Sequence, residues 1–155
     1  MTSGRRIFVD SNVLIEAVFL PDSAASAVLR LAADGTFEII TCQPVITDVE
    51  NAILKKLQST PERLNRIIES WEGILKATRL TIVPDPPSHV IQEAYELYIA
   101  IMRHKADIQI LAAALLAKPD AILSGNREHF NDLVAHKCGI RISSCAEFIE
   151  RLFQA

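Results

Sequence analysis

Short apolar runs alternate along the chain with longer segments in which apolar positions recur every three or four residues. The short runs are rich in β-branched residues and predict strands at 6–10, 37–41, 80–84, 120–124 and 139–143. The longer segments predict amphipathic helices over 12–19, 21–35, 42–58, 60–77, 88–102, 106–118 and 144–153. Residues 125–132 are expected to form a loop or a short helical turn.

Strands that alternate with helices predict parallel pairing, because each return to the same edge of a sheet requires a crossover connection. The unbroken apolar runs at 7–9 and 121–123 indicate strands that are buried on both faces. We therefore expect an α/β fold with helices on both sides of a parallel sheet. In such sheets, functional side chains gather at the carboxyl ends of the strands.

Length and composition place limits on the class of protein. A chain of 155 residues without a low-complexity segment or linker fits a single domain, 1–155. Its three cysteines include no C-x-x-C pair, so we expect neither a disulfide framework nor a structural zinc site, and we expect a reducing cytoplasm. The longest apolar run, 110–117, is shorter than the roughly 20 residues that cross a bilayer, so no membrane association is expected.

Three acidic residues are candidates for chemistry. Asp10 follows the first strand directly, where a charge is costly unless the strand opens into a polar cleft. In the third predicted helix the stripe Ile46, Val49, Ile53 and Leu57 spans roughly 80°. Glu50 falls just outside this stripe, whereas Asp48 falls on the far side, where solvent is expected. Asp107 begins a helix that is apolar on nearly every face. Helix capping is the alternative role for Asp10 and Asp107.

Neutral oxygens and basic groups accompany these acids. The segment SGNREHF follows the fourth strand and offers Ser124 and Asn126 as oxygen donors and Arg127 and His129 as hydrogen-bond donors. Taken alone, this segment is more typical of a tight turn, because Gly125 and Asn126 tolerate positive φ. His104 and Lys105 precede Asp107 and are suited to contact with phosphate.

Together these segments predict a metal pocket at one edge of the sheet. Carboxylates that share a pocket repel one another unless cations lie between them, and hard oxygen ligands favour Mg²⁺ or Mn²⁺. Such a site is suited to metal-assisted phosphodiester hydrolysis. No histidine cluster, nucleotide-binding loop or G-x-S-x-G motif points to a different chemistry. The net charge of −3 argues against nucleic-acid binding by bulk electrostatics.

Four blocks of the sequence resemble the signature blocks of the PIN domain. They are IFVDSNVLIEA, the segment VITDVENAI with its Glu, HKADIQILAAAL and AILSGNREHF, which match in order and spacing from about residue 6 to 150. The chain is most similar to the small stand-alone PIN proteins of bacterial toxin–antitoxin pairs, the VapC-type group. The resemblance implies a three-layer α/β/α fold and an Mg²⁺- or Mn²⁺-dependent ribonuclease, here the toxin of such a pair.

The resemblance also implies roles for single residues. Asp10, Glu50 and Asp107 fall on the metal-binding acids of the family, and Asn126 falls on a fourth position that many members fill with Asp. A neutral amide is a weaker metal ligand, which leaves open whether one or two metals bind. Ser11 and Asn12 fall on small polar positions that hold the pocket or the phosphate. His104, Lys105 and Arg127 are expected to contact phosphate.

The expected partners are RNA, a protein antitoxin and a second copy of the chain. The main alternative is a PIN fold without activity that serves as a binding module, an option that Asn126 keeps open. A phosphoacceptor receiver domain would need a pair of acids after the first strand, and a dehalogenase-like phosphatase would need D-x-D there. The residue two positions after Asp10 is Asn12, so both classes fit less well.

Overall fold

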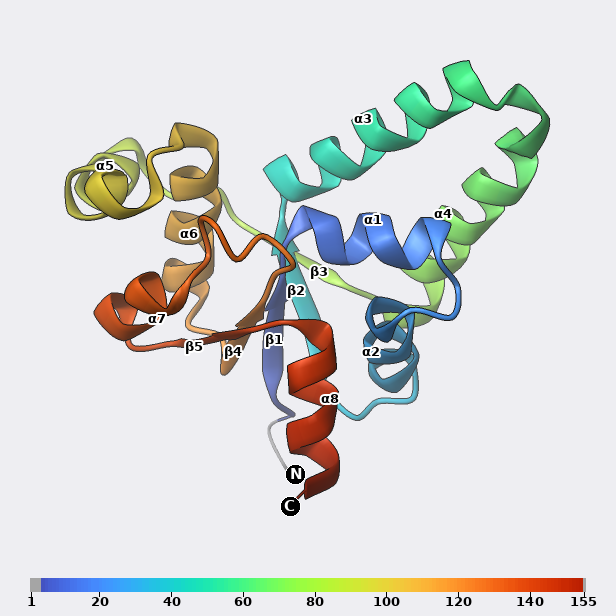
Figure 1. Ribbon diagram of the computed structural model, residues 1–155. Coiled ribbons are helices and arrows are strands. Elements are labelled where there is room, and N and C mark those ends of the chain that lie inside the picture. The colour runs from blue at the N-terminus through green and yellow to red at the C-terminus, as the bar shows by residue number, and fades with distance from the viewer. Residues whose placement is uncertain (1–3, 155) are drawn as a thin grey trace.

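The computed structural model describes residues 4–154, so residues 1–3 and 155 of the predicted single domain lie outside the described residues. A five-stranded sheet with all neighbours parallel and the order β3-β2-β1-β4-β5 crosses the molecule (Figure 1). The strands are β1 (Arg6–Val9), β2 (Glu38–Cys42), β3 (Thr81–Val83), β4 (Ala121–Leu123) and β5 (Arg141–Ser143).

Helices form a layer on each side of this sheet (Figure 1). One layer contains α1 (Ser11–Phe19), α2 (Ala24–Ala33), α3 (Gln43–Ser59), the 3-10 turn η1 (Pro61–Arg63), α4 (Leu64–Thr78) and α8 (Cys145–Gln154). The other contains α5 (Ser88–Met102), α6 (Lys105–Ala117) and α7 (Asp132–Cys138). The far ends of α3 and α4 extend beyond the sheet as a helical hairpin joined by η1.

The predicted three-layer α/β/α class and the parallel sheet are confirmed, with strand limits within two residues of those expected. The prediction for the segment after β4 was incomplete, because α7 begins at Asp132 where only a loop or turn was expected. Asn131 caps this helix by accepting a hydrogen bond from the Val134 amide at 3.1 Å, and Gly139 ends it in the left-handed region. Both are standard helix-end signals.

The order of the strands determines where a site forms. After β1, the chain adds β2 and β3 on one side and then crosses to add β4 on the other. The carboxyl ends of β1 and β4 therefore flank the point where the winding direction reverses, which is the usual position of a ligand crevice. Val9 pairs with Leu123, so the residues that follow these two strands lie side by side.

A single cluster of buried apolar side chains extends from the sheet into both helical layers. The central strands supply its middle, where Phe8, Val9, Ile122 and Leu123 are fully buried. The three cysteines are free, as predicted. Within residues 4–154 no single helix has the length and apolar character needed to cross a membrane. Helices α1 and α2 taken together are long and apolar enough, but the chain bends by 96° between them.

Candidate active site

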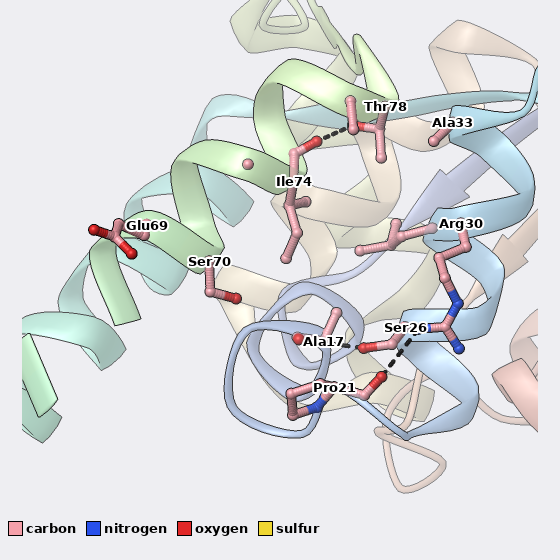
Figure 2. Close-up of a pocket in the computed structure, with 12 residues that line it drawn as sticks. Ala17, Pro21, Ser26, Arg30, Ala33, Glu69, Ser70, Ile74 and Thr78 are labelled. Atoms are coloured by element: carbon pink, nitrogen blue, oxygen red, sulfur yellow. Dashed lines mark hydrogen bonds between the residues drawn. The ribbon is translucent and has the colours of Figure 1, made fainter. Parts of the chain in front are cut away.

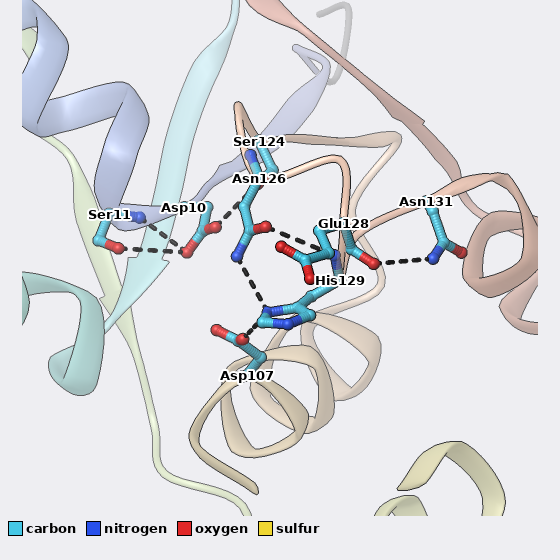
Figure 3. Close-up of polar contacts among 8 residues, drawn as sticks. All are labelled: Asp10, Ser11, Asp107, Ser124, Asn126, Glu128, His129 and Asn131. Atoms are coloured by element: carbon cyan, nitrogen blue, oxygen red, sulfur yellow. Dashed lines mark hydrogen bonds and ion pairs between the residues drawn. The ribbon is translucent and has the colours of Figure 1, made fainter. Parts of the chain in front are cut away.

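Asp10 lies at the centre of the polar edge, directly after β1. Its backbone amide donates to the Leu123 carbonyl at 3.0 Å, which continues the β1–β4 ladder by one residue. One carboxylate oxygen accepts from the Ser11 amide at 2.8 Å at the start of α1, and the other accepts from the Ser124 hydroxyl at 2.8 Å. The hydrogen bond that caps α1 and the hydrogen bond from Ser124 thus hold the two oxygens of one carboxylate beside the end of β4 (Figure 3).

Burial makes the charge on Asp10 costly. The side chain is 2% exposed, and this desolvation raises its pKa above the ordinary 3.8, although the hydrogen bonds from Ser124 and Ser11 act in the opposite direction. The carboxylates of Asp107 and Asp48 raise the pKa further. Asp10 is therefore a carboxylate whose anionic form needs a neighbouring cation.

The acid that α3 brings to this cluster is Asp48. Desolvation and the charge of Asp107 raise its pKa, while a hydrogen bond from the Ser11 side chain lowers it. Glu50 is exposed and lies about 200° around the helix from Asp48, on the opposite side. Both side chains are exposed, as expected for Asp48, and the metal-binding role expected for Glu50 stays a prediction. The predicted stripe omitted Val45, which is fully buried and extends the packed face toward Asp48.

Asp107 enters the cluster from the first turn of α6. It faces Asp10 from the other helical layer, with the loop after β4 beside it (Figure 3). One of its carboxylate oxygens pairs with Nδ1 of His129 at 2.5 Å, and both side chains are less than a fifth exposed. His129 had been noted only as a hydrogen-bond donor, and its position next to an acid from another layer carried no signal in the sequence.

Asn126 shapes the loop rather than facing Asp10 directly. Its backbone N–H donates to the Ser124 hydroxyl at 3.0 Å, and its side-chain oxygen accepts from the backbone N–H of His129 at 3.4 Å. Its Nδ2 lies 3.2 Å from Nδ1 of His129. Phe130, fully buried, anchors the end of this turn, since its amide donates to the Asn126 carbonyl at 2.9 Å.

The remaining predicted residues divide into two groups. Ser11 touches the acids, whereas Asn12 accepts a hydrogen bond from the Gly125 amide at 2.9 Å and so ties α1 to the loop after β4. Arg127 does not point to the cluster: its guanidinium donates to the Ile142 carbonyl at 3.1 Å and to Asp132 at 3.0 Å. The phosphate contact predicted for Arg127 is therefore not supported.

His104 and Lys105 lie at the start of α6 and are exposed. The imidazole of His104 packs against that of His129, with ring centroids 4.3 Å apart and planes tilted by 33°. His104 is thus exposed to solvent on one side and packs against a side chain of the cluster on the other.

The donor chemistry at this edge fits a divalent cation. The charges of Asp107 and Asp48 raise the pKa of Asp10, and the charge of Asp107 raises the pKa of Asp48. The Ser124 hydroxyl and the Asn126 side-chain oxygen add neutral oxygens. Hard oxygen donors in this number suit Mg²⁺ or Mn²⁺. Repulsion between the acids is relieved when such a cation binds between them.

A second hollow lies between α1, α2 and α4 and has a volume of about 280 Å³ (Figure 2). Most of its polar side chains are already bonded to nearby backbone. Ser26 donates to the carbonyls of Ala17 and Leu20, Arg30 donates to that of Pro21, and Thr78 donates to that of Ile74. This hollow therefore presents no converging acids or nucleophiles, and the polar edge remains the candidate active site.

Comparisons with known proteins agree with this architecture. The family model of the PIN domain matches residues 6–128. Among solved structures, the chain is similar to one described as VapBC2 from Rickettsia felis bound to a DNA fragment from their promoter. The TM-score is 0.60 at 13% identity over 90% of this chain and 97% of the other. No curated protein matches the sequence significantly.

Proposed function

Because the chain belongs to the PIN domain family, we propose that it is a divalent-metal-dependent endoribonuclease that hydrolyses phosphodiester bonds at the carboxyl edge of β1 and β4. The observation that carries the proposal is the convergence of Asp10, Asp48 and Asp107 from three separate elements. PIN domains are in general nucleases, and acids collected in this way are stable when a cation is bound among them.

The chain's own residues have distinct tasks in this reaction. Asp10, at the end of β1, and Asp107, in the first turn of α6, would hold Mg²⁺ or Mn²⁺. Asp48 would complete the acid set in the place first expected for Glu50. Ser124 and Ser11 hold the Asp10 carboxylate by hydrogen bonds to its two oxygens. When bound, the cation neutralises phosphate charge and activates water for attack. Asn12 and Asn126 keep the loop after β4 in place beside the acids.

Cleavage of a mixed RNA pool tests the proposal. The full chain should cut RNA with Mg²⁺ or Mn²⁺ and stop when EDTA is added. Asp10→Asn and Asp107→Asn should each lower the rate by at least about 100-fold, because each removes a charged ligand. Asp34→Asn is the matched control, since Asp34 is an exposed acid at the end of α2, and it should cut at the unchanged rate.

Two results would overturn the assignment. Cleavage that persists in EDTA would remove the metal from the mechanism, and full activity of Asp10→Asn would place the site elsewhere. If the folded chain cuts no RNA with any metal, the PIN fold acts here as a binding module. The amide at Asn126 and the contact of His129 with Asp107 favour this second candidate function.

The biological setting that we propose is that of a cytoplasmic toxin held inactive by a protein antitoxin. The support is the similarity to a structure described as a VapBC2 assembly and the likeness to VapC-type sequences. Expression of the chain alone should slow bacterial growth, and Asp107→Asn should restore growth. Equal growth of the two strains would contradict the toxin role while leaving the nuclease assay unaffected. We propose a homodimer as the second assembly, to be checked by light scattering.

A further inference from the structure

Two histidines and an acid meet where α6 begins. The ligand atoms of His104, Asp107 and His129 all lie within 4.8 Å of one another. His104 and Asp107 are three residues apart at the start of α6, so they share one side of its first turn. His129 reaches them from the loop after β4, as Figure 3 shows for its contact with Asp107.

We propose that His104, Asp107 and His129 form a mixed nitrogen–oxygen site for a borderline divalent transition metal of the Zn²⁺ and Co²⁺ type. The inference goes beyond the proposed nuclease site and shares only Asp107 with it. Imidazole nitrogen favours such metals, whereas sites made of oxygens alone favour Mg²⁺. Three protein ligands also leave a coordination position open to solvent or substrate, as in catalytic rather than structural zinc sites.

The contacts of His129 leave its Nδ1 suited to bind a cation. Its Nδ1 faces the Asp107 carboxylate, which can only accept a hydrogen bond, and also Nδ2 of Asn126, which can only donate one. A ring nitrogen carries either a proton or a lone pair, so it satisfies one neighbour and conflicts with the other. A cation between Nδ1 and the carboxylate accepts lone pairs from both. Rotation of the Asn126 amide would then turn its oxygen toward the ion.

The surroundings allow the three ligands to close on an ion. Zinc ligands lie about 2 Å from the metal, so the ligand atoms must draw slightly closer than their present spread. His104 is exposed at the cap position of α6, and its ring packs only against that of His129 in the cluster. His129 is partly buried and held by its turn, with its amide bonded to Asn126 at 3.4 Å. One fixed and one adjustable imidazole suit a site that forms around the metal.

Metal titrations of the full, metal-stripped chain test this site without any RNA. Calorimetry should show Zn²⁺ binding at least about 10-fold more tightly than Mg²⁺. Co²⁺ should develop visible absorption bands that Zn²⁺ removes. His129→Gln and His104→Gln should each weaken Zn²⁺ binding by at least about 10-fold and alter the Co²⁺ spectrum. Mg²⁺ affinity should fall by less than the Zn²⁺ affinity does in the same variant, because the oxygen ligands remain.

The control is His89→Gln, since His89 is exposed on α5, and it should bind Zn²⁺ and Co²⁺ like the parent. Circular dichroism checks that each variant is folded. An unchanged Co²⁺ spectrum and Zn²⁺ affinity in folded His129→Gln would overturn the proposal. Histidine-dependent Zn²⁺ binding in a chain that cuts no RNA would instead leave this site standing and remove the nuclease.

Discussion

At the scale of single residues, Asp10 shows how one side chain serves the fold and the site together. It continues the β1–β4 ladder, caps α1 and presents a carboxylate that is 2% exposed. Its capping role is satisfied by one oxygen, so the other remains available to Ser124 and to a cation. The same burial destabilises the metal-free protein, because the charged carboxylate is desolvated.

Asp10→Asn should therefore stabilise the metal-free protein at pH 7, because an amide carries no charge to desolvate. We expect a rise in Tm of about 2–4 °C, which corresponds to roughly 1 kcal/mol for a chain of this size. Mg²⁺ should raise the Tm of the parent chain and leave that of the variant unchanged. Thermal denaturation followed by circular dichroism checks both, and a lower Tm in the metal-free variant would contradict the expectation.

The same residue predicts a pH dependence. The folded pKa of Asp10 lies above its ordinary value of 3.8, so the folded state holds its proton to higher pH than the unfolded state. The free energy of unfolding of the metal-free chain should then fall as pH rises from about 3.8 toward the folded pKa, and stay low above it. Asp10→Asn should show a smaller decrease in urea titrations at several pH values. Equal slopes would contradict the raised pKa.

Asp48 and Glu50 provide a matched pair two residues apart on one helix. Asp48→Asn should reduce cleavage by about 10-fold or more, whereas Glu50→Gln should change it by less than about twofold, because only Asp48 faces the acids. Initial rates at limiting Mg²⁺ are the measurement. If Glu50→Gln proved the more damaging change, the assignment from the hydrogen bond of Asp48 with Ser11 and its charge interaction with Asp107 would be wrong.

At the scale of elements, helix ends determine where the functional side chains begin. α5 ends at Arg103 in the left-handed region with φ of 61°, and this tight reversal starts α6 within two residues. Asp107 consequently lies in the first turn of α6, where the helix dipole favours a carboxylate. α4 and α6 also end on non-glycine residues with positive φ, Arg79 and Lys118.

At Arg79, far from the candidate active site, the free-energy cost of ending a helix on a non-glycine residue with positive φ can be measured. Arg79→Gly should raise the free energy of unfolding by about 0.5–1 kcal/mol, because glycine adopts φ of 51° without strain. Lys76→Gly, in the last turn of the same helix, should lower it by about 1 kcal/mol. Urea denaturation of both variants is the measurement. Two changes of the same sign would contradict the strain at Arg79.

At the scale of the whole molecule, one apolar core connects both helical layers through the sheet. The described chain should therefore unfold in a single calorimetric transition, with an enthalpy of ~110 kcal/mol near 60 °C at ~0.7 kcal/mol per residue. Mg²⁺ should shift this transition upward without splitting it. Two resolved transitions would indicate that the α3–α4 hairpin, which extends beyond the sheet, unfolds independently.

The pattern of the sequence by itself determined the elements and their order. Unbroken apolar runs and spacings of three and four residues reflect local burial, so the five strands, most helices and the parallel α/β class followed from them. Strand ends also pointed to Asp10, and the helix start pointed to Asp107. The seven-residue α7 was missed although Asn131 and Gly139 marked its limits, because its short apolar pattern resembles that of a loop.

Only the tertiary structure decided which side chains meet. Whether Asp48 or Glu50 faces Asp10 depends on how α3 packs, and the buried Val45 rotates the packed face toward Asp48. The contact of His129 with Asp107 joins residues 22 positions apart from two different elements. Spacing along one helix or strand is set by covalent geometry and local hydrogen bonds. Contacts between elements depend on packing across the sheet, and no periodic pattern in the sequence reports that packing.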